Sequence, residues 1–316
     1  MGSILKMNLI SGLVSIAIPT YKGKYLDEAI NSAINQEYNN IEIIVVNDQS
    51  PNDIEPIVCN YNDKRIRYYS NKKNIGKEDP TINWNRCLDY AKGEFFVLLC
   101  DDDILLPNFV KELIGLANKY PFCNVFHSPK KIIDENNNII REEGLWPEWE
   151  DLECFYEEKK KYNRFHTITE FLYRTEYIKK LKYNEFPVAW GSDDISIIKF
   201  AKEGGIASAP MPLAAFRENR EQISCNNTHM FEKAKARILN IFWLADFFKG
   251  YKYDSKYMHF LDLLMIEFIK RTNFVDKIHI LLIVPRQSWS IIRKTKILLG
   301  IFLGKYKHPG YGAIGV

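Results

Sequence analysis

Three adjacent carboxylates, Asp101–Asp103, stand directly behind a run of strand-forming apolar residues, Phe95 to Leu99. Like charges at the end of a buried strand repel one another, because little water is present to dissipate the repulsion. A divalent cation that prefers oxygen ligands, Mg²⁺ or Mn²⁺, would neutralise this repulsion and keep coordination positions for substrate phosphates. A solvated acidic turn that caps a helix explains the same residues equally well, so the cluster alone does not decide between the two.

A second acidic pair, Asp193 and Asp194, follows the segment Trp190-Gly191-Ser192 in the first turn of a predicted helix. A carboxylate at this place could remove a proton from a hydroxyl group. Acidic residues in the first turn also complement the helix dipole, and without further evidence that structural interpretation is favoured.

The elements expected to position Asp101–Asp103 are strands and helices that alternate along the sequence. The expected strands are Leu13–Pro19, Ile41–Asp48, Arg65–Ser70 and Phe95–Leu99, and the expected helices are Tyr25–Gln36, 52–61, Asp79–Gly93 and about Pro107–Tyr120. This alternation predicts parallel βαβ units, with Gly93 just past the end of its helix. Ligands bind at the carboxyl ends of the strands in such sheets. Pro19–Tyr21, Asn47–Asp48 and Asp101–Asp103 are therefore expected at one edge.

The middle of the chain, residues 130–182, is less regular. The stretch DENNNII is expected to be a turn between short strands, and residues 142–161 to be a charged loop region containing Trp. Such a region either folds over a ligand or is a surface insertion.

Three segments in this order resemble a known family: VSIAIPTYKGKYLDEAINSAINQEYNNIEIIVVNDQS, NIGKEDPTINWNRCLDYAKGEFFVLLCDDDILLP and WGSDD. They are similar to the inverting glycosyltransferases of family 2, of the type that builds bacterial polysaccharides such as O-antigen. The resemblance covers roughly residues 13–225. It implies an α/β GT-A fold, a Rossmann-like mixed sheet flanked by helices, with a helical extension. The implied division is an N-terminal tail at 1–12, a catalytic domain at 13–230 and a helical, basic region at 231–316.

The resemblance also implies roles for the polar clusters at the strand ends. Asp48 would accept a hydrogen bond from the uracil N–H, and Asp102, supported by Asp103, would bind Mn²⁺ or Mg²⁺. One departure is Cys100, where many relatives carry Asp. The other residues implied to bind the nucleotide sugar in this region are Pro19, Thr20, Tyr21, Asn74, Gly76 and Asp101.

In the second half, the resemblance makes Asp194 the catalytic base, with Asp193 where Glu is commoner. Arg217 and Arg220 either bind the diphosphate or lie in a solvent-facing loop. His229 is a candidate for the metal shell, and Trp190 either stacks on the acceptor sugar or packs in the core.

The remaining features bound the class of protein and its location. A net charge of +3 is too small to argue for nucleic acid as the main partner. The six cysteines form no CxxC pair, so reduced thiols and a cytoplasmic protein are expected. Residues 277–316 carry seven Lys and Arg and no Asp or Glu. This tail either lies on the inner face of the cell membrane as a peripheral element or packs on the catalytic domain.

The sequence therefore predicts a metal-dependent inverting hexosyltransferase. Its donor would be a nucleotide sugar, a UDP-sugar by preference, and its acceptor a glycan or a polyprenyl-diphosphate-linked glycan in bacterial surface polysaccharide synthesis. The alternatives are a catalytically inactive family member acting as a membrane-associated scaffold, and a nucleotidyltransferase. The second is weak, because PTYKGKY has only one glycine where such enzymes carry a Gly-rich basic loop.

Overall fold

The computed structural model describes residues 8–162, 164–219, 222 and 229–248. The chain divides into two compact units between residues 228 and 229. The described part of the second unit is the helix α8 (Met230–Phe247). No helix among the described residues is long and apolar enough to cross a membrane. The expected membrane-surface tail lies outside the described residues.

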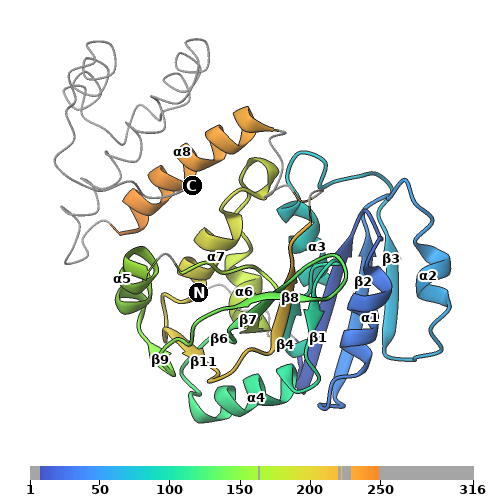
Figure 1. The fold of residues 1–316 in the computed structure, drawn as a ribbon, viewed down its shortest axis with the longest axis horizontal. Helices are drawn as coiled ribbons and strands as arrows, with labels where there is room; N and C mark the ends of the chain where they lie inside the picture. Colours follow the sequence, from blue (N-terminus) through green and yellow to red (C-terminus); the bar gives the residue numbers. More distant parts are fainter. Residues whose placement is uncertain (1–7, 163, 220–221, 223–228, 249–316) are drawn as a thin grey trace, which may run out of the picture. The chain divides into compact units, whose positions relative to one another are not determined.

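The first unit is built on a mixed sheet that has eight strands among the described residues, in the order β3-β2-β1-β4-β10-β6-β11-β9 (Figure 1). The strands β3, β2, β1 and β4 run parallel, as predicted, whereas β10 is antiparallel to both of its neighbours. The strand bounds are β1 Ile10–Thr20, β2 Ile41–Asn47, β3 Ile66–Ser70, β4 Gly93–Leu98, β6 Val125–His127, β9 Trp149–Glu150, β10 Phe171–Arg174 and β11 Ile206–Ser208.

Helices cover both faces of this sheet (Figure 1). Leu26 and Ile30 of α1 and Phe109 and Leu113 of α4 share one apolar cluster with alternate residues of β1, β2 and β4. α3 and α6 pack against the sheet as well. The helix bounds are α1 Leu26–Ile34, α2 Glu55–Cys59, α3 Thr81–Tyr90, α4 Phe109–Lys119, α5 Leu152–Tyr162, α6 Thr175–Leu181 and α7 Ser192–Phe200.

A second sheet has the order β5-β12-β7-β8 within the described chain. Its strands are β5 Ile104–Leu105, β7 Lys130–Ile133, β8 Ile139–Glu142 and β12 Ala214–Arg217. Because β4 belongs to the first sheet and β5 to the second, the three aspartates between them occupy the turn from one sheet to the other. The fold therefore fixes both ends of the acidic turn.

Two local predictions were wrong. Gly93 does not end a helix: it begins β4, where an added Cβ would lie 2.5 Å from the Leu13 carbonyl oxygen, so close strand packing is what requires glycine. Residues 142–161 are not simply a loop, because they include β9 and most of α5. The cysteines among the described residues are unpaired: Cys59, Cys87, Cys100, Cys123 and Cys154.

Candidate active site

Neutral donors hold the outer two carboxylates of the acidic turn. Asp101 accepts a hydrogen bond of 2.6 Å from the Thr20 hydroxyl and one of 3.3 Å from the Tyr21 N–H. Asp103 is buried and accepts hydrogen bonds from the Thr169 hydroxyl at 2.6 Å and the Arg217 N–H at 3.1 Å. The end of β1 is thereby joined to the acidic turn, as the predicted sheet edge requires.

Asp102 lies between them and is half-buried. Its Oδ2 accepts hydrogen bonds from the side-chain amides of Gln222, at 2.9 Å, and Asn219, at 3.2 Å. Burial, followed by the charge of Asp102, raises the pKa of Asp101 to about 6. The same two causes raise the pKa of Asp103 well above its ordinary value.

The turn fits a divalent cation. One ligand atom each of Cys100, Asp102 and Asp103 lie within 4.8 Å of one another. Burial raises the pKa of the Cys100 thiol, which disfavours a thiolate and leaves the two carboxylates as the suitable hard donors. A cation here would relieve the repulsion that raises the pKa of the neighbouring carboxyls.

Asp48, at the end of β2, organises the loop expected beside the nucleotide base. Its carboxylate accepts hydrogen bonds from the Gly76 N–H at 2.7 Å, the Ile75 N–H at 2.9 Å and the Asn71 amide at 2.8 Å. An added Cβ at Gly76 would lie 2.8 Å from Asp48 Oδ2, so glycine allows this close approach. The half-buried Asn74 precedes these residues in the same loop.

Arg217 is buried beneath the acidic turn. Its Nε donates to the Asp102 carbonyl oxygen at 2.9 Å and its Nη1 to Asn137 Oδ1 at 2.7 Å. Nη2 pairs with Glu28 at 2.8 Å, and the guanidinium carbon lies 4.2 Å from the centre of the Tyr25 ring. The expectation that this fork faces a diphosphate or solvent does not match its position: the guanidinium supports the turn from inside.

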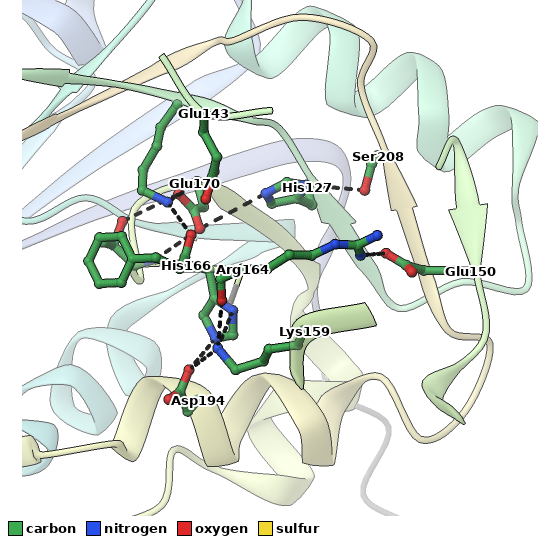
Figure 2. Close-up of polar contacts among 12 residues, drawn as sticks. His127, Glu143, Glu150, Lys159, Arg164, His166, Glu170, Asp194 and Ser208 are labelled. Atoms are coloured by element: carbon green, nitrogen blue, oxygen red, sulfur yellow. Dashed lines mark hydrogen bonds and ion pairs between the residues drawn. The ribbon is translucent and has the colours of Figure 1, made fainter. Parts of the chain in front are cut away.

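Two basic side chains meet one oxygen of Asp194. Lys159 Nζ and His166 Nε2 each lie 2.8 Å from Asp194 Oδ1, as Figure 2 shows. Lys159 belongs to α5, and His166 lies in the segment before β10. The predicted acidic pair thus lies where the irregular middle of the chain meets α7.

The two members of the acidic pair titrate in opposite directions. Burial and the charge of Asp194 raise the pKa of Asp193 to about 7. For Asp194, desolvation acts upward, but Lys159 and His166 outweigh it and hold the pKa of this carboxyl well below its usual range. Asp194 is therefore the ionised member at neutral pH.

The turn before this pair has unusual backbone angles. Val188 and Ala189 have φ of 52° and 56°, and Gly191 has φ of 75°. A β-branched residue at positive φ costs about 1–3 kcal/mol. The Val188 N–H donates to the Glu78 carbonyl oxygen at 2.8 Å, which ties this turn to the loop that contains Gly76.

A second group of metal-type side chains, His127, Glu143 and Glu170, is also close-packed. Lys130 Nζ already lies 2.7 Å from Glu170 and 3.1 Å from Glu143. Because this ammonium supplies the positive charge between the carboxylates, the group does not fit a metal ion.

A cleft of about 770 Å³ is lined by Glu143 of this group and by residues close in sequence to Lys159 and His166. Glu158 and Arg164 of its wall flank Lys159 and His166 in the sequence, and the Arg164 carbonyl oxygen accepts a hydrogen bond from Lys159 Nζ at 3.2 Å. Its lining residues are Ile132, Arg141, Glu143, Gly144, Leu145, Trp146, Pro147, Glu158, Arg164 and Phe165.

The other predicted site residues are placed as follows. Pro19 is half-buried and Tyr21 exposed at the end of β1, and Trp190 is half-buried in the turn before α7. His229 is exposed and belongs to the second unit, 4.0 Å from Glu232. Arg220 lies outside the described residues.

Comparison with known proteins decides the family. The model of Glycosyl transferase family 2 matches residues 15–182, more than half of the chain. This chain belongs to glycosyltransferase family 2. The match confirms the predicted family, which is named for glycosyl transfer. The matched segment holds Asp48 and the acidic turn, whereas Asp193 and Asp194 follow it.

Relatives of known sequence are also glycosyltransferases. The chain is 42% identical over 138 residues to an uncharacterized glycosyltransferase of Rickettsia typhi, covering 43% of this chain and 42% of that protein. It is 36% identical over 132 residues to the GalNAc(5)-diNAcBac-PP-undecaprenol beta-1,3-glucosyltransferase of Campylobacter jejuni, covering 41% of each. The chain thus spans less than half the length of these two relatives. An uncharacterized glycosyltransferase of Haemophilus influenzae is 28% identical over 84% of this chain and 83% of its own length.

Solved structures confirm the GT-A fold. S. aureus TarS 1-349 in complex with UDP-GlcNAc superposes with a TM-score of 0.62 at 15% identity, over 93% of each chain. The mannosyltransferase PcManGT of Pyrobaculum calidifontis, in complex with GDP-Man and Mn²⁺, gives 0.54 at 17% identity, over 93% of this chain and 81% of that one.

Sequence reasoning missed Lys159, His166 and Thr169. Lys159 sits in the run EEKKK, which has the composition of a solvated helix face, and His166 is an isolated histidine. Thr169 bonds both Asp103 and, at 3.1 Å, the Cys100 N–H. None of the three stands at a strand end or in a motif, so their roles depend on tertiary contacts.

Proposed function

We propose that this family 2 enzyme is a metal-dependent inverting hexosyltransferase that uses a UDP-sugar and builds a bacterial surface glycan. The observation that carries the proposal is the convergence of Asp48, Asp101 and Asp102 at the carboxyl ends of β2 and β4, the two strands on either side of β1. The UDP-GlcNAc complex of TarS, which shares the fold, supports a UDP-sugar.

The donor's uracil would lie at Asp48. A carboxylate offers about four acceptor directions, and three donors of this chain already use some of them. The remaining direction suits the ring N–H of uracil. Thr20, Tyr21, Asn74 and Gly76 would then surround the nucleoside.

Asp102 and Asp103 would hold Mn²⁺ or Mg²⁺, and the Mn²⁺ in the PcManGT complex supports such an ion. When bound, the ion would stabilise the charge that develops on the departing diphosphate. Asp101, with its raised pKa, would lie beside the ribose and diphosphate. Arg217 is reassigned from ligand to support of this turn, Arg220 remains a candidate for the diphosphate, and His229 for the metal shell.

Asp194 would act as the general base. As the acceptor oxygen forms its bond to the anomeric carbon, the bond from that carbon to the diphosphate oxygen breaks on the opposite face. The hydroxyl proton passes to Asp194, and the electron pair leaves with the nucleoside diphosphate. Attack opposite the leaving group inverts the configuration.

The acceptor would enter through the cleft beside Lys159 and meet Trp190 near the base. Its aromatic and charged lining, with Phe165 and Arg164, suits a glycan, which presents both apolar C–H faces and hydroxyls. The C. jejuni relative acts on an undecaprenol-diphosphate-linked glycan, which supports a lipid-linked acceptor here. A basic tail at the inner face of the membrane would bring the enzyme to such a substrate. If a truncation at about residue 276 still sedimented with membranes, the tail would not be the anchor.

Slow donor hydrolysis tests the function without knowledge of the acceptor. A panel of UDP-, GDP- and dTDP-sugars is incubated with the full chain and Mn²⁺, and release of the nucleoside diphosphate is followed. We expect release from one or a few UDP-sugars, abolished by EDTA and restored by Mn²⁺. A chain that neither hydrolyses any donor nor binds UDP with Mn²⁺ would be the inactive scaffold instead.

A further inference from the structure

We propose that Lys159 and His166 are positioning residues that hold one carboxylate oxygen of Asp194 and leave the other to receive the acceptor's proton. The inference rests on the proposed role of Asp194 as base. It adds two residues from outside the family 2 motifs to the machinery of that role.

Both contacts converge on the same atom. Lys159 Nζ and His166 Nε2 are each 2.8 Å from Asp194 Oδ1 (Figure 2). His166 is buried, whereas Asp194 keeps 43% of its side chain exposed. The carboxylate is thus anchored from the protein side and open on the other.

The lysine also sets the hydrogen-bonding state of the histidine. Lys159 Nζ lies 3.2 Å from His166 Nδ1, and an ammonium can only donate, so Nδ1 must accept. The proton of the neutral ring then sits on Nε2, the nitrogen that lies 2.8 Å from Asp194 Oδ1. Burial and the charge of Lys159 lower the pKa of His166 to about 4, which keeps this ring neutral at physiological pH.

Buried polar contacts fix the segment that carries His166. The Arg164 carbonyl oxygen accepts from Lys159, and the Arg164 guanidinium pairs with Glu150 at 2.7 Å. The next carbonyl, of Phe165, accepts from the buried Lys130 at 2.8 Å. The backbone just before His166 is therefore held by polar contacts on the protein side.

Within the described part of the chain, four titratable groups interact with Asp194. Lys159 on α5 and His166 before β10 favour its ionised form, whereas Asp193 on α7 and Tyr156 on α5 interact with its negative charge unfavourably. Lys159 is the one permanent cation among these four. Removing it should make Asp194 protonate at a higher pH.

The test is the pH profile of kcat for transfer, or for donor hydrolysis if the acceptor is unknown. The acid limb of this profile is the fall in kcat at low pH as Asp194 is protonated. For Lys159→Met we expect this limb to shift to higher pH by about 1–2 units, because an adjacent opposite charge shifts a carboxyl pKa by about that much. The KM for the donor should stay within about twofold, since the donor lies at the other acidic cluster. Lys159→Arg, which keeps the positive charge, should return the acid limb to the pH at which it lies in the unmodified protein. Lys180→Met, which removes an exposed lysine paired with Glu176, is the matched control and should leave the profile unchanged.

His166 is tested by a pair of variants, because it is buried. His166→Gln keeps an N–H donor and should retain activity within about tenfold, whereas His166→Phe removes the donor and should lower kcat by at least about a hundredfold. Urea unfolding and UDP binding, measured on both, show whether each variant is folded.

Asp194→Asn separates this inference from the function it rests on. Suppose that Asp194→Asn is inactive but Lys159→Met lowers kcat equally at every pH without moving the limb. The role of Asp194 as general base would then be retained, and the positioning role of Lys159 would be overturned. If Asp194→Asn turns over normally, the base itself is wrong. If Lys159→Met moves the limb and Lys159→Arg moves it back, the positioning role is confirmed.

Discussion

The two acidic clusters of this chain, Asp101–Asp103 and Asp193–Asp194, have different neighbours. At the turn between β4 and β5, neutral hydroxyls and amides hold the carboxylates, and burial, followed by the charge of Asp102, raises the pKa of Asp101 and Asp103. At the start of α7, the chain supplies its own cation, because Lys159 pairs with Asp194. The first arrangement suits an external divalent ion, and the second suits a carboxylate that stays ionised to accept a proton. Pairs of aspartates with similar sequences therefore suit different chemistry, according to the charges of their neighbours.

The largest effect should come from the cluster that is proposed to hold a divalent ion. We expect Asp102→Asn to lower the rate of transfer or donor hydrolysis by about 10³ or more, because a bound metal contributes several kcal/mol to stabilising the leaving charge. Rates are measured over a range of Mn²⁺ concentrations. Asp89→Asn, which changes an exposed aspartate paired with Lys182, serves as control. A rate for Asp102→Asn close to that of the control would remove this residue from the metal site.

The second cluster should affect the chemical step alone. Asp194→Asn is expected to lower kcat by about 10²–10⁴ while UDP affinity stays nearly the same. Asp193→Asn distinguishes the two members, since the pKa of Asp193, raised to about 7, would also suit a general base. If Asp193→Asn were the inactive variant and Asp194→Asn were active, the roles within the pair would have to be exchanged.

How far the sequence predicted these clusters depends on what positions them. Asp48 and Asp102 follow apolar strands whose order and parallel direction are readable from local patterns, so their common edge was predictable. Lys159 and Asp194 are separated by β10, α6 and their connecting loops, and their contact depends on how α5 packs in the folded chain, which no local pattern encodes. Arg217 shows the same limit: its type suited a diphosphate, but its burial under Asp102 depends on β12 pairing with β5 and β7.

A smaller effect should come from the loop that Asp48 organises. Gly76→Ala would place a Cβ 2.8 Å from Asp48 Oδ2 and 3.2 Å from Pro80 Cα. We expect a loss of about 1–3 kcal/mol in the free energy of unfolding and weaker UDP binding. The measurements are urea unfolding and calorimetric titration. Gly115→Ala in α4, where an added Cβ meets nothing within 4 Å, should instead stabilise the protein by about 0.5–1 kcal/mol. Equal behaviour of the two variants would contradict the close approach at Gly76.

The smallest effect concerns stability in acid. Because the pKa of His166 is lowered from its ordinary 6.5 to about 4, its contribution is present above pH 6.5 and is lost as the pH falls towards 4. Between pH 7 and pH 5 this amounts to about 2 kcal/mol. Urea unfolding at both values should show His166→Gln losing less stability than the unmodified protein over this interval. The buried His127, whose pKa is lowered mainly by burial, is present in both proteins. An identical pH dependence in the two would mean that His166 is not held neutral.

Calorimetric titration of UDP into the full chain, with Mn²⁺ and with EDTA, tests the central difference between the clusters most directly. We predict that UDP binds tightly only with Mn²⁺, that Asp102→Asn abolishes the metal-dependent part, and that Asp194→Asn preserves it. Equal UDP affinity in Mn²⁺ and EDTA, or metal-dependent binding that survives in Asp102→Asn, would contradict the account.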